Sequence, residues 1–366
     1  MSWPVRCENG VFRITQTTAS LPTNQKIDDE FMSTSSNYSI ALFGAGRIGR
    51  VHADNIDRHP STQIKCIVDP FGSGAAELSE KYHCSAVDED TVFSDDSIDA
   101  IVICSATETH GDLIERGMNN GKAVFCEKPI DLSIERVDSV LKATSDSKSP
   151  LLLGFNRRFD PGIASMEKRI RAGDIGDVEL VTVISKDPSP PPAEYIRVSG
   201  GLFRDMTVHD FDLARFMLDE EPITVHATAA ALVDPMIKSE GDIDTAIVTL
   251  QCASGKMAVV TNSRRATFGY DQRIEVHGSL GSLRTNNIPE TALVLEREEG
   301  VRHEKPMHFF LERYRDAYQV EWAHFVDVLD GKCQPSVSGE DGRRALMIAD
   351  AAYASLESGA RVSIDT

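Results

Sequence analysis

The chain has 366 residues and a formal net charge of −19. This length predicts two domains, because single hydrophobic cores stop growing at roughly 250–300 residues. The acidic balance argues against nucleic acid as a partner. No apolar run reaches the roughly 18 residues that a membrane helix needs, so we expect no membrane partner. A neutral or cationic small molecule fits this charge.

The N-terminal segment 1–38 differs from the rest of the chain. It is polar and weakly periodic, and it lacks the basic and apolar regions of a secretory signal. We expect either a disordered extension or a start assigned too early, with Met32 as the alternative start.

The seven cysteines are scattered, and none forms a C-x-x-C pair. Several lie inside apolar runs such as "AIVICS". Because small core cysteines of this kind are typical of reducing compartments, we expect a cytoplasmic protein. No cluster of Cys and His suggests a structural metal, and we expect no metal ion.

Short apolar runs alternate with helical patterns in the first half, residues 39–156. Strands are predicted at 39–46, 62–70, 85–87, 99–105, 122–129 and 150–156, and helices at 47–59, 74–82, 108–121 and 133–146. This alternation predicts a doubly wound parallel α/β sheet of the Rossmann type.

The second half, residues 157–366, has a different texture. Strands at 178–187, 223–233, 245–253, 256–265 and 273–285 often follow one another directly, with helices at 205–219, 310–330 and 339–358. The Pro-rich stretch 187–195 is predicted to be a loop. We expect an α+β domain with a large, open, mostly antiparallel sheet, whose C-terminal helices can pack back on the first domain.

A glycine-rich loop follows the first strand. Gly44, Gly46 and Gly49 match G-x-G-x-x-G, which lets a backbone turn tightly beneath a pyrophosphate at a helix N-terminus. The alternative is a simple strand-to-helix turn. Asp69 ends the second strand, where a carboxylate binds ribose hydroxyls and repels a 2′-phosphate. We therefore expect NAD as the cofactor, although Asp69 could instead be a turn residue before Pro70.

Lys128, in the run "CEKPI", follows a parallel strand. A lysine at this edge lies where cofactors bind, and its ammonium can stabilise an alkoxide as hydride leaves. The alternative is a solvated surface lysine.

Asp205 and His209 are four residues apart, so they share one face if this segment is helical. An imidazole can take a hydroxyl proton near neutral pH, and a carboxylate can orient it or bind another hydroxyl. One alternative is an ordinary ion pair between neighbouring helical turns. The other is a metal site, for which two ligands on a helix are not enough and no third cluster is present in the sequence.

Asn156 and Arg157, in "GFNRRFDP", follow the last strand of the first half. Amide and guanidinium donors there could read substrate hydroxyls between the domains. Alternatively, Arg157 and Arg158 start a helix and pair with acidic neighbours.

These four motifs occur in the same order in the Gfo/Idh/MocA oxidoreductases, which the chain resembles from about residue 39 to its end. The run "SKDPSPPPAEYIRVSGGLFRDMTVHDFDLARF" is especially similar to the members that act on myo-inositol. One departure is "CSATETH", which lacks the proline that often follows the Ser or Thr in this family.

The resemblance implies roles for individual residues. Gly44, Gly46 and Gly49 would lie on the dinucleotide phosphates together with Arg47 and Ile48, and Asp69 on the adenosine ribose. Ser105 and His110 would line the nicotinamide side, and Glu127 its ribose. Lys128, Asp205 and His209 match the catalytic residues. The residues that would read substrate hydroxyls are Asn156, Arg157, Asp187 and, in the same pocket, Tyr270.

From the resemblance we expect an NAD-dependent enzyme that oxidises a ring secondary alcohol of a neutral cyclic polyol, myo-inositol, to the ketone. A homotetramer assembled through the open sheets is also expected, since assembly would cover an exposed sheet face. Two alternatives stay open: a dehydrogenase for another sugar or inositol isomer, and an NAD-binding sensor or co-repressor without turnover.

Overall fold

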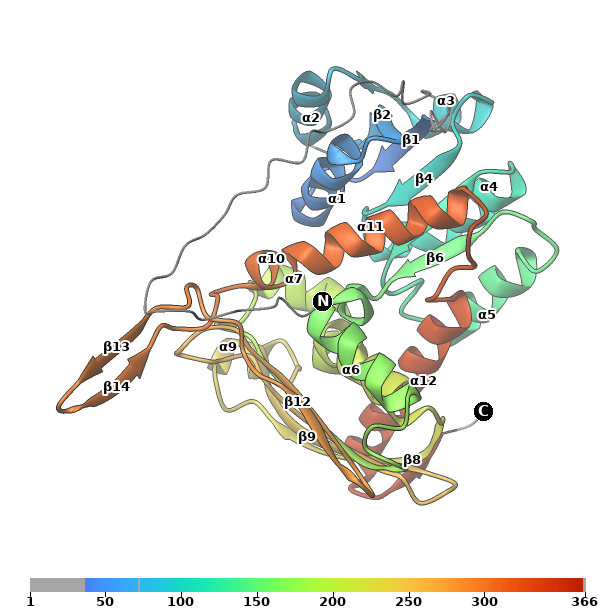
Figure 1. Cartoon of the computed structure of the whole chain (residues 1–366). Helices are drawn as coiled ribbons and strands as arrows, with labels where there is room; N and C mark the ends of the chain where they lie inside the picture. The colour runs from blue at the N-terminus through green and yellow to red at the C-terminus, as the bar shows by residue number, and fades with distance from the viewer. Residues whose placement is uncertain (1–36, 72, 365–366) are drawn as a thin grey trace, which may run out of the picture. The chain divides into compact units, whose positions relative to one another are not determined.

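The computed structural model describes residues 37–71 and 73–364. The expectation for segment 1–38 therefore lies outside the described residues, except that Tyr38 opens the first strand. The described residues belong to one compact unit, which contains two large β-sheets, a two-stranded hairpin and the helices around them (Figure 1). Among the described residues, no helix is both long and apolar enough to cross a membrane.

The first sheet is parallel throughout, as predicted. Its strands lie in the order β3-β2-β1-β4-β5-β6. Their bounds are β1 Tyr38–Phe43, β2 Thr62–Val68, β3 Ser85–Ala86, β4 Ala100–Ile103, β5 Ala123–Glu127 and β6 Leu151–Gly154. Because the order reverses between β1 and β4, the loops after these strands diverge and leave a crevice where nucleotides bind in such folds.

Helices connect these strands at the predicted places, except for the helix Glu89–Ser94, which was not predicted. They are α1 Arg47–Arg58, α2 Gly74–Tyr82, α3 Glu89–Ser94, α4 His110–Asn119 and α5 Ile134–Ala143, with a 3₁₀ turn at Thr107–Thr109 before α4. α1 packs against α2, and α4 packs against α5. Right-handed crossovers on the two sides of β1 place these pairs on opposite faces of the sheet, which is the doubly wound arrangement.

The second sheet has the order β12-β11-β7-β10-β9-β8-β15. Its strands are β7 Val178–Lys186, β8 Pro222–Ala230, β9 Thr245–Cys252, β10 Met257–Ser263, β11 Asp271–Gly278, β12 Gly281–Thr285 and β15 Val362–Ser363. All neighbours are antiparallel except β7 and β10. The mostly antiparallel sheet is confirmed, and its one parallel pair helps to build the site.

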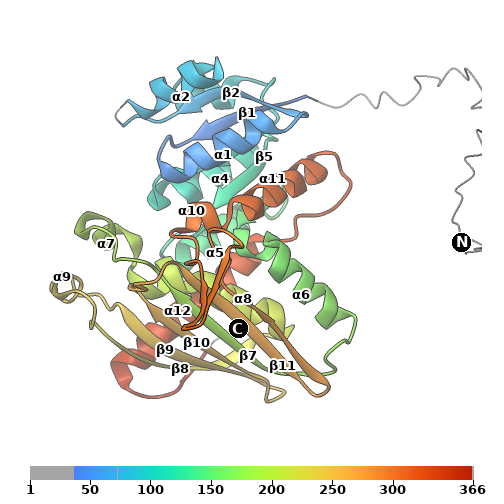
Figure 2. The same cartoon turned by 60° about the vertical axis from the view of Figure 1, so that its left-hand side comes forward.

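Helices cover one face of this sheet. α8 (Val208–Leu218) packs on β7 and β10, and α12 (Gly339–Ser358) packs on β8 and α8 (Figure 2). Side chains alternate along β9: Ala246, Val248 and Leu250 are buried, whereas Ile247 and Thr249 are exposed. No helix of the described residues therefore covers the opposite face along β9.

The remaining elements are shorter or return to the first sheet. They are a 3₁₀ turn at Asn156–Phe159, α6 Pro161–Arg171, α7 Ala193–Ser199, α9 Pro235–Ser239, the hairpin β13 Val294–Arg297 and β14 Gly300–His303, α10 Phe310–Arg313 and α11 Arg315–Leu329. α11 packs against α1, and its Trp322 and Phe325 join the core of the parallel sheet.

The structure differs from the sequence prediction at two places near the motifs. The predicted loop 187–195 ends early, since α7 begins at Ala193, directly after Pro192. The predicted helix 205–219 is a five-residue π-helical turn, Phe203–Thr207, followed by α8. Hydrophobic periodicity indicates a helix but does not reveal its hydrogen-bond spacing, and π turns are frequent at functional sites.

Candidate active site

The glycine loop lies between β1 and α1. Gly44 has a φ of +94°, and a Cβ there would meet the Cys104 carbonyl oxygen at 2.4 Å. A Cβ at Gly49 would meet the Gly44 oxygen at 2.0 Å, so helix and loop approach too closely for any side chain. Both positions require glycine for steric reasons.

The loop also fits a dinucleotide. A Cβ at Gly46 would meet no protein atom within 4 Å, so this side of the backbone is open to a ligand. Gly46 is the N-cap of α1, which has neither a side-chain cap nor an acidic residue in its first turn. Free N–H groups and the helix dipole there favour an anion such as a pyrophosphate. Arg47 is exposed beside them, with its guanidinium 5.5 Å from the Phe309 ring, and Ile48 packs into the core.

Asp69 is tied to this loop. Its Oδ2 accepts a 2.7 Å hydrogen bond from the Ala45 N–H, and its Oδ1 accepts one from the Phe71 N–H. Each carboxylate oxygen retains a lone pair that can accept from a ribose hydroxyl. The carboxylate thus lies where the sequence predicted it, and it also braces the glycine loop.

The next strand ends carry the residues predicted for the nicotinamide side. Ser105 shares a 2.6 Å hydrogen bond with the Thr109 hydroxyl. His110 is buried, and its two ring nitrogens lie 2.7 Å from the Pro129 oxygen and 3.1 Å from the Ser105 oxygen. Because both nitrogens face backbone carbonyls, His110 ties these two loops together instead of presenting its ring to a ligand.

Glu127 lies at the end of β5 and is nearly buried. Its Oε1 lies 2.8 Å from Nε2 of His52, a fully buried residue of α1. This contact fixes the glutamate beside Lys128.

Lys128 is not a solvated surface lysine, since its side chain is only 14% exposed. Its Nζ donates a 2.8 Å hydrogen bond to the backbone oxygen of Asp205 and lies 3.7 Å from the carboxylate Oδ1 of the same residue. The first-half lysine and the second-half aspartate therefore meet.

His209 lies in the first turn of α8, directly after the π-helical turn that contains Asp205. Its ring contacts the edge of Phe155 at a centroid distance of 5.7 Å, and its Nδ1 is buried with no hydrogen-bond partner among the described residues. Burial, followed by the charges of Lys128 and Arg157, lowers the pKa of His209 well below its usual range. The imidazole is therefore neutral at physiological pH, and a neutral ring nitrogen can accept a hydrogen bond from a hydroxyl.

The sequence prediction paired Asp205 with His209 on one helix face. Among the described residues, however, the Asp205 carboxylate bonds to other groups. Its Oδ1 accepts a 2.7 Å hydrogen bond from the Tyr195 hydroxyl, and its Oδ2 accepts a 3.2 Å bond from Arg264 Nη2. The π-helical turn changes the angle between the two side chains, so spacing four no longer implies a contact.

Asp187 lies in the same group. Its Oδ2 is 3.7 Å from Nη1 of Arg264, and burial raises its pKa to about 7 against the opposing charge of Arg264. Sequence analysis missed Arg264. β7 and β10 are the parallel pair, with Lys186 opposite Ser263, so the next residues, Asp187 and Arg264, emerge side by side. A prediction of that pairing would have found them.

Tyr195 was also missed, because its segment was predicted to be a loop without a role. It lies on α7, and its hydroxyl reaches Asp205. The only signal in the sequence is an aromatic residue shortly after the Pro-rich stretch.

Arg157 is paired instead of free. Its Nη1 lies 2.5 Å from Oδ1 of Asp210, and Asn262 donates to the other oxygen of Asp210. Arg158 pairs with Asp212 in the same way. These contacts match the alternative in which both arginines pair with acidic neighbours. Asn156 is buried in the same turn.

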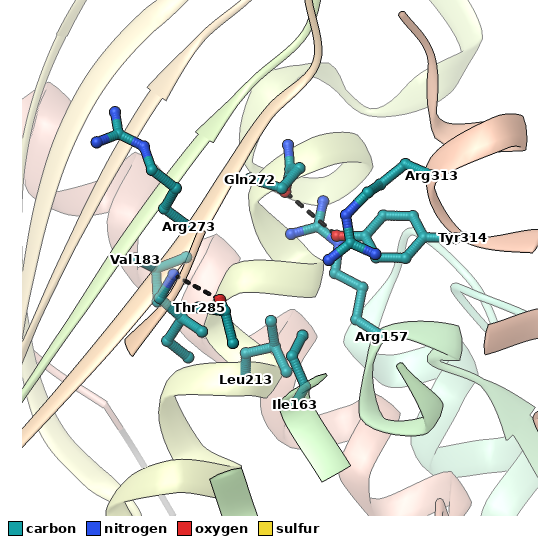
Figure 3. A pocket seen from close by; sticks show the side chains of 10 residues that line it. Arg157, Ile163, Val183, Leu213, Gln272, Arg273, Thr285, Arg313 and Tyr314 are labelled. Atoms are coloured by element: carbon teal, nitrogen blue, oxygen red, sulfur yellow. Dashed lines mark hydrogen bonds between the residues drawn. The ribbon is translucent and has the colours of Figure 1, made fainter. Parts of the chain in front are cut away.

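Behind Arg157 lies a small pocket, shown in Figure 3. Arg157, Gln272, Arg313 and Tyr314 converge on it, and the Tyr314 hydroxyl donates to Gln272 at 3.5 Å. The pocket has space for little more than one water molecule, so it cannot hold a sugar-sized ring. Tyr270 is buried with its ring edge toward Tyr314, and burial raises its pKa.

Among the described residues, no group of three or more His, Cys, Asp or Glu side chains is arranged to hold a metal ion. The fold brings together an open loop that can bind a dinucleotide, an amine, a neutral imidazole, and several carboxylates that can accept hydrogen bonds from hydroxyl groups. Together they define a nicotinamide-dependent oxidoreductase.

Comparison with known proteins identifies the family. The model of an oxidoreductase family with an NAD-binding Rossmann fold matches residues 38–155, and that of the GFO/IDH/MocA C-terminal domain matches residues 163–284. The chain belongs to the Gfo/Idh/MocA family and is an NAD-dependent oxidoreductase, as the resemblance implied.

One relative and two solved structures show which proteins the chain is similar to. Inositol 2-dehydrogenase of Rhizobium meliloti is 48% identical over 88% of this chain and 98% of its own. The crystal structure of a putative myo-inositol dehydrogenase from Sinorhizobium meliloti has a TM-score of 0.87 at 47% identity, covering 90% of this chain and 100% of its own. Scyllo-inositol dehydrogenase from Lactobacillus casei, solved with NAD(H) and scyllo-inositol, has a TM-score of 0.84 at 28% identity, covering 90% of this chain and 100% of its own.

Proposed function

We propose that this protein oxidises a ring secondary alcohol of myo-inositol to the ketone 2-keto-myo-inositol, with NAD⁺ as cofactor. The observation that carries the proposal is the meeting of Lys128 and Asp205 beside a neutral, buried His209. The 48% identity to an inositol 2-dehydrogenase supports the choice of substrate.

His209 takes the hydroxyl proton in this proposal. Its lowered pKa keeps the imidazole unprotonated, and its unpartnered Nδ1 is a buried polar atom able to accept a proton or a hydrogen bond. Lys128 donates to the same substrate oxygen and favours its anionic form. Asp205 accepts hydrogen bonds from a neighbouring hydroxyl. When bound, NAD⁺ supplies the acceptor for the substrate hydride.

We assign the cofactor to the open edge of the parallel sheet. The pyrophosphate would lie on Gly44, Gly46 and Gly49 with Arg47 and Ile48, and the adenosine ribose on Asp69. Ser105, Glu127 and Lys128 would face the nicotinamide, with His110 holding their loops in place.

We assign the polyol to the space bordered by Lys128, Asp205 and His209. Asp187 is the best-placed further acceptor, since Arg264 joins it to Asp205. We keep Asn156 and Tyr270 in the proposed site, where these buried residues would line its wall. The charge of Arg157 helps to lower the pKa of His209, and its guanidinium forms an ion pair with Asp210. We therefore assign Arg157 no direct contact with the substrate.

We infer a homotetramer and a cytoplasmic location. The outer face of the second sheet carries exposed apolar residues such as Ile247 and Met257, and a second copy would cover them. The six described cysteines are all free thiols, which fits a reducing compartment. For the domain division we keep 39–156 as the NAD-binding domain and 157–366 as the substrate and assembly domain.

The experiment is to follow NADH formation with myo-inositol, scyllo-inositol and glucose side by side. We expect myo-inositol to have the highest kcat/KM. A preference for scyllo-inositol or glucose would favour the alternative of a dehydrogenase for another isomer or sugar. A protein that binds NAD but oxidises none of the three would favour the sensor or co-repressor alternative.

His209→Ala tests the assigned base. A positioned base contributes about 10²–10⁴-fold, so kcat should fall by that factor while NAD still binds. His277→Ala, at an exposed histidine of β11, is the control and should keep wild-type turnover. Near-normal turnover by the His209 variant would contradict the assignment.

A further inference from the structure

The carboxylate of Asp205 is held at both oxygens. The Tyr195 hydroxyl donates to Oδ1 at 2.7 Å, and Arg264 Nη2 donates to Oδ2 at 3.2 Å. Lys128 Nζ lies 3.7 Å from Oδ1. A carboxylate oxygen accepts along a small number of lone-pair directions. These contacts therefore fix which directions remain for a ligand.

Arg264 connects two acceptors of the site. It is only 2% exposed, and its two terminal nitrogens lie near different carboxylates, Asp205 at 3.2 Å and Asp187 at 3.7 Å. A guanidinium is planar and presents its N–H groups in a rigid fork. One side chain thus sets the separation and relative orientation of both carboxylates.

Tyr195 reaches Asp205 from the outer side. Tyr195 is 46% exposed, so its ring lies at the edge of the site while its hydroxyl points toward Asp205. The helix that carries it is anchored near its C-terminal end. Arg197, in the last turn of α7, forms a two-bond ion pair with Glu240, the residue that follows α9.

We propose that Tyr195 and Arg264 are positioning residues that fix the Asp205 carboxylate, one at each oxygen, and thereby determine which arrangement of polyol hydroxyls the site accepts. This inference rests on the proposed function. Isomers of a cyclohexane polyol differ in the axial or equatorial direction of one hydroxyl, so a carboxylate of fixed orientation discriminates between them. A freely rotating carboxylate would not.

Tyr195→Phe removes only the hydroxyl. A hydrogen bond to a charged group corresponds to roughly a 10-fold change or more in an equilibrium. We expect the KM for myo-inositol to rise about 10-fold and kcat to change less than about 3-fold. The ratio of kcat/KM for myo-inositol to that for scyllo-inositol should change at least about 3-fold, and the KM for NAD should stay the same.

Tyr82→Phe is the matched control. The Tyr82 hydroxyl donates to the Asp54 carboxylate at 2.6 Å, so the same kind of phenol–carboxylate bond occurs here in the other domain, the nucleotide-binding one. This variant should keep the wild-type KM values and isomer ratio.

Arg264→Lys tests the second oxygen. A lysine has one nitrogen in place of the fork, so it can serve Asp205 or Asp187 but not both. We expect a change in the isomer ratio together with a rise in polyol KM. Arg265→Lys, at the exposed neighbouring arginine, should leave both unchanged.

Two kinetic results would overturn the proposal. One is a Tyr195→Phe enzyme with the wild-type polyol KM and isomer ratio. The other is an equal loss of kcat and of NAD affinity with a lower melting temperature, which would indicate a structural role alone.

A measurement without substrate separates this proposal from the proposed function. In protein labelled with ¹³C at tyrosine Cζ, Asp205→Asn should shift the Tyr195 signal, assigned by its loss in Tyr195→Phe, and should leave the Tyr82 signal in place. An unshifted Tyr195 signal would refute the contact, whether or not the wild-type protein oxidises any polyol.

Discussion

At the scale of single residues, Asp187 should make catalysis depend on pH near neutrality. Burial is the largest cause that raises its pKa to about 7, with the nearby charge of Asp205 adding to it and Arg264 opposing it. Below this pH the carboxyl is neutral and is a weaker acceptor for a substrate hydroxyl. Above it both oxygens of the carboxylate accept, as the proposed site requires.

We therefore expect the KM for the polyol to fall as the pH increases through about 7, measured at saturating NAD. Asp187→Asn has nearly the same shape as the neutral acid, so its KM should lack this inflection. An Asn variant that keeps the wild-type inflection would show that another group titrates.

Single residues also show where sequence reasoning succeeded and where it stopped. The glycines, Asp69 and Lys128 lie at strand ends, so predicted strands were enough to bring them to one edge. Arg264 and Tyr195 could not be found in this way. Their placement depends on one parallel pairing and on a helix that begins directly after Pro192.

At the scale of elements, α11 carries a buried acid. Glu321 is fully buried, and neither carboxylate oxygen has a hydrogen-bond partner among the described residues. Burial, followed by the charge of Glu127, raises the pKa of Glu321 well above its usual range. The folded state therefore keeps a proton that the unfolded chain releases above a pH of about 4.3.

Because the folded pKa is the higher one, this group reduces stability as pH rises above the unfolded value. Glu321→Gln stays neutral at every pH. We expect its melting temperature to exceed that of the wild type by about 2 °C or more at pH 8, and by less at pH 5. Glu357→Gln, at an exposed glutamate of α12, is the control, and its melting temperature should match that of the wild type at both pH values. An equal difference at pH 5 and pH 8 would contradict a buried, protonated Glu321.

Elements of regular period were predictable, and irregular ones were not. Apolar patterns identified α1, α4 and α5 together with the strands of the first sheet and most strands of the second. The two-residue strand β15 was not predicted, and β11 and β12 were predicted as one run. The π-helical turn that carries Asp205 has the same hydrophobic pattern as an α-helix, so only the observed hydrogen bonds distinguish it. That turn is the reason why Asp205 contacts Tyr195 and Arg264.

At the scale of the whole molecule, the uncovered face of the second sheet should be where copies assemble. Ile247, in β9, is 55% exposed on this face, and Met257 of β10 is 48% exposed. Ile247→Glu would place a charge inside the proposed interface, where burying it without a partner is costly.

We expect this variant to dissociate from a tetramer into smaller species, measured by light scattering after size exclusion. Val320→Glu, on the exposed side of α11, should keep the wild-type mass. A wild-type protein that is monomeric would refute the tetramer directly. An Ile247→Glu tetramer would place the interface elsewhere.

The sequence by itself determined the doubly wound fold, the cofactor loop and the residues that carry the proposed chemistry. These follow from local patterns: glycine spacing, strand periodicity and polar residues at strand ends. Only the tertiary structure decided which side chains meet. It pairs Arg157 with Asp210, and it closes Tyr195 and Arg264 around Asp205. Such contacts join residues far apart in the chain, and strand pairing and helix geometry, which no local pattern encodes, bring them together.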